Sequence, residues 1–218
     1  MAPDAGNRPP YKANWRTPKS SDHIEIKSRI EAGDTQKLRT YFQDVDEQTV
    51  KVLAEKYGHL VPPARLENLA NQPTHFETPA DFEENYRAAF GQPPEPSLVG
   101  YTKRGHSAHV STEDIAGIPE AVVHERLHQL EDPRAEKILG TKLSEGITED
   151  LAIETSGREP VIGDPVAYPE GRASAQFLRK LVGDKAVEEA YFQGNPTTLK
   201  LRLDEAFKDK AEKPNFAG

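Results

Sequence analysis

One stretch constrains the fold more than any other, because it places two histidines and a glutamate within an apolar run: AVVHERLHQL, residues 121–130. Pro119 suits the first turn of a helix and the Asp-Pro pair after the stretch suits its end, so the sequence predicts a helix over residues 118–131. A wholly exposed helix would not need so many apolar side chains. We therefore expect a helix that packs against the core on one side and directs His124 and His128 toward a cleft.

These two histidines suit a metal ion. They are four residues apart, so on a helix they project from one side, one turn from each other. Two imidazoles in this arrangement can bind one divalent ion, and Glu125 then lies beside the water on that ion, close enough to take its proton. H-E-x-x-H is the sequence signature of this arrangement. The alternative is a helix that carries two surface histidines and a surface glutamate by chance.

A second predicted helix, over residues 144–154, offers a third protein ligand. Ser144 suits its N-cap, and Glu145 and Glu149 lie four residues apart on a shared face. One of these carboxylates could bind the metal while the other accepts a hydrogen bond from a ligating imidazole. Glutamates at this spacing also occur on solvated helix faces, but downstream of H-E-x-x-H the metal site is the favoured interpretation.

The remaining sequence is mostly helical in its pattern, with apolar residues at spacings of three and four. Asp46 and Thr78 are expected to be N-caps. SLVGYTKRGHSAHVST, residues 97–112, predicts two short strands in a hairpin. The predicted fold class is therefore α+β and predominantly helical. The expected divisions are a disordered lead-in over residues 1–21, a helical N-terminal region over 22–91, and a core over 92–212 that ends in helices over 170–209.

Composition excludes several classes of function. The formal net charge of −8 makes the chain a poor candidate for binding nucleic acid or anionic lipid. The absence of cysteine excludes disulfides, thiolate nucleophiles and cysteine-ligated metals. There is no apolar run of about 18 residues that could span a membrane. The N-terminus lacks the apolar segment of a Sec-type signal peptide. We expect a soluble protein, either cytoplasmic or exported by a dedicated secretion or injection system; nothing predicts its oligomeric state.

HERLH followed by SEGITE resembles the gluzincin class of zinc metallopeptidases. In thermolysin-like and aminopeptidase N-like members, the second helix carries an Asn-Glu-Gly/Ala motif with an acidic residue four positions later. This sequence has Ser144 in place of the usual Asn. The resemblance implies a zincin-like fold with a strand element before the motif helix and a helical C-terminal lobe. It implies that one zinc ion is held by His124, His128 and Glu145, that Glu125 is the general base, and that Glu149 is the partner of a ligating histidine.

The expected reaction is hydrolysis of peptide bonds in a peptide or protein substrate. Zinc polarises the carbonyl and activates water, while Glu125 takes the proton and later passes it to the leaving amine. Such enzymes also need a donor to the developing oxyanion. Tyr168 is favoured, because it lies at the start of a downstream helix that could close over the site. The other candidates for substrate binding are His106, His109 and Tyr101, in the predicted hairpin, where a peptide could add to a strand edge.

Three interpretations stay open at this point. The first is a zinc endopeptidase; the short chain and its YFxG-type tail resemble compact metallopeptidase domains of bacterial toxins and injected effectors. The second is an aminopeptidase or an amidase of the same architecture. The third is a non-catalytic zinc-binding or scaffold domain that binds a partner through its helical N-terminal half.

Overall fold

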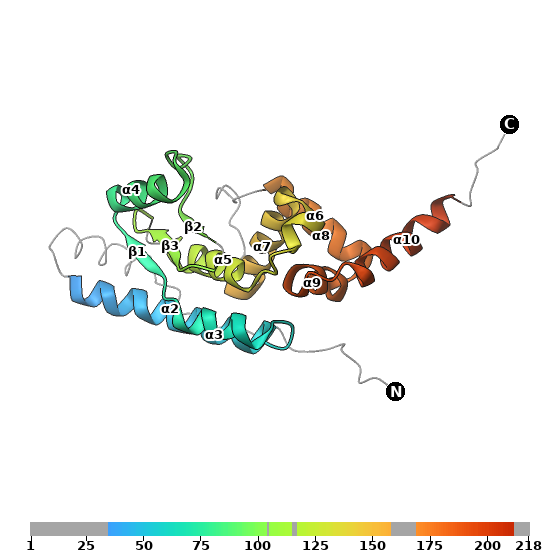
Figure 1. Cartoon of the computed structure of the whole chain (residues 1–218), viewed down its shortest axis with the longest axis horizontal. Helices are drawn as coiled ribbons and strands as arrows, with labels where there is room; N and C mark the ends of the chain where they lie inside the picture. Colours follow the sequence, from blue (N-terminus) through green and yellow to red (C-terminus); the bar gives the residue numbers. More distant parts are fainter. Residues whose placement is uncertain (1–34, 104, 115–116, 158–168, 212–218) are drawn as a thin grey trace.

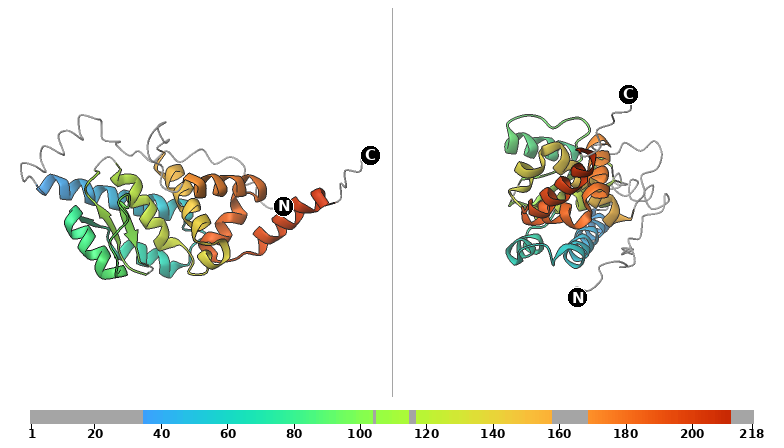
Figure 2. Two further views of the ribbon diagram at one scale, coloured as in Figure 1. Left: turned by 90° about the horizontal axis from the view of Figure 1, so that it is seen from above. Right: turned by 90° about the vertical axis from the view of Figure 1, so that its right-hand side faces the viewer.

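The structure, a computed structural model, describes residues 35–103, 105–114, 117–157 and 169–211. These residues form a predominantly helical α+β fold with one three-stranded sheet, which confirms the predicted fold class. The sheet lies toward one end of an elongated molecule and the C-terminal helices toward the other, with α5 (Ile118–Leu130) and α7 (Thr141–Ser156) between them (Figures 1 and 2). The predicted lead-in over residues 1–21 lies outside the described residues.

From Thr35 to Phe90, the N-terminal part combines three helices with a short strand. Its elements are α2 (Thr35–Tyr57), α3 (Pro63–Asn71), β1 (His75–Glu77) and α4 (Pro79–Phe90). The predicted cap at Thr78 is confirmed, because its hydroxyl accepts the backbone N–H of Asp81. The predicted cap at Asp46 is wrong: α2 continues through this residue, and its carboxylate accepts hydrogen bonds from Arg126 and Thr74 instead.

The sheet has the strand order β1-β3-β2, so β2 (Gly100–Thr102) lies at one edge. It pairs antiparallel with β3 (Ala108–Ser111), as the predicted hairpin requires. β1 pairs with the other side of β3 in parallel and was not predicted, because three residues are too few to show an alternating pattern. The sheet packs on α5 through Val110, whose neighbours include Ile118 and Val122.

The described residues of the C-terminal part form helices and no strand. Beyond α7 these are α8 (Pro169–Val182), α9 (Asp184–Gln193) and α10 (Thr197–Ala211), and the short α6 (Ala135–Leu139) joins α5 to α7. α7 and α8 meet at two glycines: a Cβ added to Gly146 would lie only 2.1 Å from the carbonyl carbon of Gly171. This close contact places the first turn of α8 against the residue that follows Glu145. Of the helices described, none is both long and apolar enough to cross a membrane.

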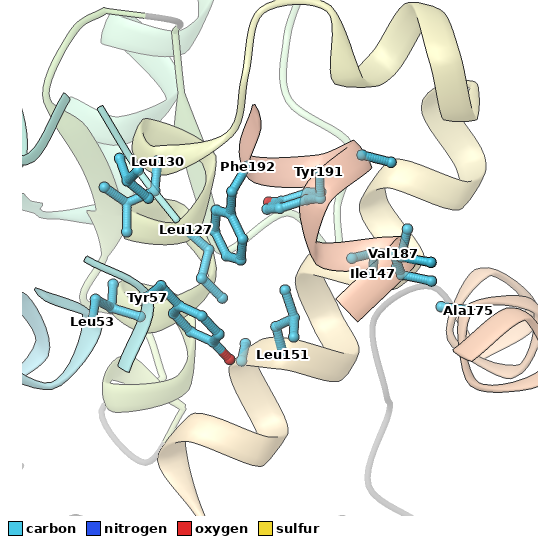
Figure 3. Packing of buried hydrophobic residues seen from close by; sticks show 14 of the residues in the cluster. Leu53, Tyr57, Leu127, Leu130, Ile147, Leu151, Ala175, Val187, Tyr191 and Phe192 are labelled. Atoms are coloured by element: carbon cyan, nitrogen blue, oxygen red, sulfur yellow. The ribbon is translucent and has the colours of Figure 1, made fainter. Parts of the chain in front are cut away.

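The main hydrophobic core joins α2, α5, α7 and α9 (Figure 3). Its largest members are Leu53, Tyr57, Leu127, Leu130, Ile147, Leu151, Tyr191 and Phe192. Ten of the thirteen residues of α5 are buried, among them His124, Glu125 and Arg126. A buried polar or charged group costs free energy unless it has a partner, so each of these side chains must be satisfied within the protein. α5 is thus a central helix with polar contacts on more than one side.

Candidate metal centre

Three side-chain atoms from α5 and α7 converge on one point. They are Nε2 of His124, Nε2 of His128 and Oε2 of Glu145. The two imidazole nitrogens lie 3.2 Å apart, and the Glu145 oxygen lies 3.4 Å from His124 and 3.3 Å from His128. The side chains of His124, His128 and Glu145 are 11%, 15% and 24% exposed, so the cluster is largely buried but still accessible to solvent.

This geometry fits a tetrahedral metal ion. Zinc binds imidazole nitrogen and carboxylate oxygen at about 2.0–2.1 Å, and two ligands of a tetrahedral ion at that distance lie roughly 3.3 Å apart. The three measured separations agree with this value. Two imidazoles and one carboxylate, with a fourth position left for water or substrate, form a donor set typical of catalytic zinc. The residues present therefore fit this ion.

A carboxylate contacts the Nδ1 atom of each histidine and so orients the ring. His124 Nδ1 lies 3.0 Å from Oε2 of Glu149, and His128 Nδ1 lies 3.0 Å from Oε2 of Glu131. An ionised carboxylate only accepts, so each Nδ1 carries a hydrogen, and each Nε2 is the ring nitrogen left to bind a metal in place of a proton. The sequence predicted the arrangement for Glu149. It missed Glu131, although an acidic residue three positions after the second histidine was a visible signal.

The electrostatics of the cluster favour a cation. Burial disfavours a charged imidazole, but hydrogen bonds to Glu145 and Glu149 outweigh it and raise the pKa of His124 to about 9. Burial is likewise outweighed at His128, whose pKa is raised by Glu131 and Glu145. Burial alone would raise the pKa of Glu145, yet the two histidines lower it well below its ordinary value. The surrounding carboxylates thus stabilise positive charge at the point where the three donor atoms meet.

Glu125 lies next to this cluster and is held by the edge strand of the sheet. Its side chain is buried, and burial raises its pKa although His124 and His128 oppose this. A Cβ added to Gly100, on β2, would lie 2.8 Å from both Cγ and Oε1 of Glu125. The Thr102 hydroxyl donates to the backbone carbonyl of Glu125, which fixes β2 to α5. Only a residue without a side chain fits at position 100 while Glu125 keeps this position.

If the cluster holds one catalytic metal ion, the Gly100→Ala variant should lower the rate of hydrolysis about 10- to 100-fold while metal content stays unchanged. The added methyl forces the Glu125 carboxylate to move, and a displacement of about 1 Å can cost on the order of 100-fold in rate. Steady-state hydrolysis and elemental mass spectrometry measure the two effects. Gly117→Ala is the control, because the nearest atom to its added Cβ is a carboxylate oxygen of exposed Asp114, at 3.0 Å, and not Glu125. Equal activity of the two variants would contradict the prediction.

Among the predicted substrate-binding residues that the structure describes, Tyr101, His106 and His109 do not join the cluster. Tyr101 and His109 stack on each other, with ring centroids 4.5 Å apart, and Tyr101 contacts the aromatic rings of α4. They therefore lie on the face of the sheet opposite Val110 and α5. His106 is exposed in the hairpin loop, where its carbonyl accepts from Gln129. Tyr168 lies outside the described residues.

Comparisons of the chain with protein-family models, with curated proteins and with solved structures give no match. The functional inference therefore depends on the H-E-x-x-H motif and on the geometry of the cluster. The order of the cluster along the chain, two histidines on one helix and a glutamate on the next, is the order that the sequence predicted.

Proposed function

We propose that this protein is a zinc-dependent metallopeptidase of gluzincin type with a zincin-like fold. The observation that carries the proposal is the spacing of the donor atoms of His124, His128 and Glu145, which matches the edge of a tetrahedral zinc site. The burial of Glu125 beside these donors adds the acid–base group that such an enzyme needs.

The three donors would hold the ion, and Glu125 would move the protons. When bound, zinc supplies Lewis-acid chemistry, because it polarises a carbonyl and lowers the pKa of water. Glu125 accepts the proton of the attacking water and later donates it to the leaving amine. Burial raises the pKa of Glu125, which helps the carboxyl to hold the proton between the two steps.

The edge strand β2 is the proposed binding position for the substrate backbone. Ser111 N–H donates to the carbonyl of Val99, so this pair and the Tyr101–His109 pair are the hydrogen-bonded pairs of the ladder. The backbone groups of Gly100 and Thr102 then point to the outer edge of the sheet. An extended peptide can add there as a further strand. Gly100 also contacts Glu125, so this edge runs past the proton-transfer group.

Tyr168 stays the proposed donor to the oxyanion. It immediately precedes α8, whose first turn packs at Gly171 against Gly146, next to Glu145. This contact supports the assignment, because it ties the beginning of α8 to the helix that carries the third ligand. A toxin or effector role stays a prediction from the sequence resemblance.

Metal content is the test of this proposal. The purified protein should contain about one zinc per chain. Loss of a residue that hydrogen-bonds a metal ligand typically weakens metal binding roughly 10- to 100-fold, and Glu145→Ala, which removes a ligand itself, should weaken zinc binding by more than that. Elemental mass spectrometry and competition with a chromophoric chelator measure both. Glu154→Ala is the control, because this residue of α7 pairs with Lys56 and Arg179 instead of the cluster. A wild-type protein that binds no zinc after reconstitution would overturn the proposal.

Peptide hydrolysis then separates the remaining alternatives. Cleavage of peptides with blocked termini would indicate an endopeptidase, and a requirement for a free α-amine would indicate an aminopeptidase. Zinc binding without cleavage of a diverse peptide library would leave the amidase and the non-catalytic interpretation, which hydrolysis of non-peptide amides would separate.

A further inference from the structure

We propose that Glu131 and Ser144 form a positioning pair that orients His128, in the way that Glu149 orients His124. The inference rests on the proposed metal site and adds to it a connection between the two helices that supply the ligands. Glu131 is the C-cap residue that follows the end of α5, and Ser144 is on the first turn of α7.

The hydrogen bonds form a continuous series from α7 to the imidazole. Ser144 Oγ donates to Oε1 of Glu131 over 2.6 Å, and Oε2 of Glu131 lies 3.0 Å from Nδ1 of His128. Each oxygen of the carboxylate thus has a separate partner. Because the His128 ring is bonded at Nδ1, its Nε2 is directed at the point where Glu145 and His124 meet.

Burial makes these contacts strong. Glu131 is 6% exposed and Ser144 is 3% exposed. A carboxylate removed from water costs several kcal/mol unless its oxygens are bonded, so the side chain has a strong preference for this one orientation. The predicted N-cap role of Ser144 is wrong, because α7 begins at Thr141 and Ser144 lies inside the helix. Its hydroxyl donates to Glu131 instead of accepting a backbone N–H at the helix start.

The backbone around Glu131 is fixed independently of the side chain. Its N–H donates to the carbonyl of Leu127, and its extended conformation ends α5. The next N–H, from Asp132, donates to the carbonyl of Tyr191 on α9, and the Asp132 carboxylate binds Arg65 and Arg134. Glu131 is therefore held in place before any metal binds. Ser144 directly precedes Glu145, so one turn of α7 supplies both the third ligand and the anchor for the second.

Zinc affinity and a cobalt spectrum test the proposal. Glu131→Ala should weaken zinc binding about 10- to 100-fold, the range found for residues that orient metal ligands. Glu131→Gln should recover most of that loss, because the amide oxygen still accepts from His128 and the amide nitrogen can donate to Ser144 Oγ. With Co²⁺ in place of zinc, the visible absorption bands of Glu131→Ala should differ from those of the wild type, and those of Glu131→Gln should resemble them. Glu154→Ala is the control and should change neither readout.

The following outcomes would overturn the positioning role of Glu131 and Ser144. Zinc affinity of Glu131→Ala within about twofold of the wild type, against the 10- to 100-fold expected, overturns the positioning role, as does a Glu131→Gln variant as weak as Glu131→Ala. If Glu131→Ala does not fold, Ser144→Ala serves instead, and an unchanged affinity and cobalt spectrum in that variant also overturn the proposal. A wild-type protein without zinc would overturn the proposed function itself, so the two failures are distinguishable.

Discussion

Glu125→Gln is expected to lower peptide hydrolysis about 10²- to 10⁴-fold while the protein keeps its zinc. Glutamine has nearly the same shape as glutamate, so it fits the same buried position beside Gly100. It cannot accept a proton from water or return one to the leaving amine. The metal ligands are untouched, and the loss should therefore appear in kcat with little change in zinc content. Initial rates on a blocked peptide and elemental mass spectrometry on the same samples measure the two quantities.

Glu84→Gln provides the matched control for this substitution. Glu84 is an exposed residue of α4, so the same chemical change there should leave the rate unaltered. Hydrolysis by Glu125→Gln at the rate of the control would contradict the assigned role. If Glu125→Gln lost its activity but kept its full biological effect, catalysis would not be the function and the scaffold interpretation would replace it.

Local sequence patterns predicted the helices well because their signals lie within a few residues. Pro119 lies in the first turn of α5, as predicted, and the Asp-Pro pair follows the end of the helix at Leu130. The spacing of four places Glu145 and Glu149 on one helix face, so the sequence predicted that one of them would bond a histidine. The family resemblance implied that this residue is Glu149, and the structure pairs it with His124.

The contacts that the sequence could not predict join residues far apart in the chain. Asp46 has the local character of an N-cap, but Arg126, 80 residues later, makes its carboxylate an ion-pair partner inside a helix. Glu131 was overlooked for a different reason. Glu131 stands directly before the Asp-Pro pair, where a polar residue at the end of a helix is expected and suggests no further role. Its role becomes visible only in the fold, where the Ser144 hydroxyl donates a hydrogen bond to it. Tertiary contacts overrode local preference in both cases.

Arg126 is the second position at which we expect a large effect, in this case on stability. It is the third residue of HERLH and lies on a different side of α5 from the two histidines. The side chain is 1% exposed and makes two hydrogen bonds to the Asp46 carboxylate from Nη2, at 2.5 and 2.6 Å. Its Nη1 also donates to the carbonyls of Leu69 and Gln72. One guanidinium thus joins α2, the end of α3 and α5, the helix that carries the two histidines.

Arg126→Met should lower the free energy of unfolding by about 3–5 kcal/mol, because it leaves the partly buried Asp46 carboxylate without its counter-charge. Total stabilities of domains are only about 5–15 kcal/mol, so the variant should be close to unfolding. Urea titration of the zinc-free protein measures the shift without the stabilisation that bound metal adds. The control is Arg87→Met, since the exposed Arg87–Glu83 pair on α4 contributes only a few tenths of a kcal/mol.

The double variant Arg126→Met with Asp46→Leu distinguishes the ion pair from the packing of the arginine side chain. Replacing both members of a buried pair with apolar residues is often nearly neutral, so the double variant should be more stable than Arg126→Met alone. Equal unfolding midpoints for Arg126→Met and Arg87→Met would contradict the prediction. A double variant no more stable than Arg126→Met would assign the loss to the carbonyl contacts of Arg126. In that case α3 would hold α5, and the histidines on it, in place through backbone groups instead of through Asp46.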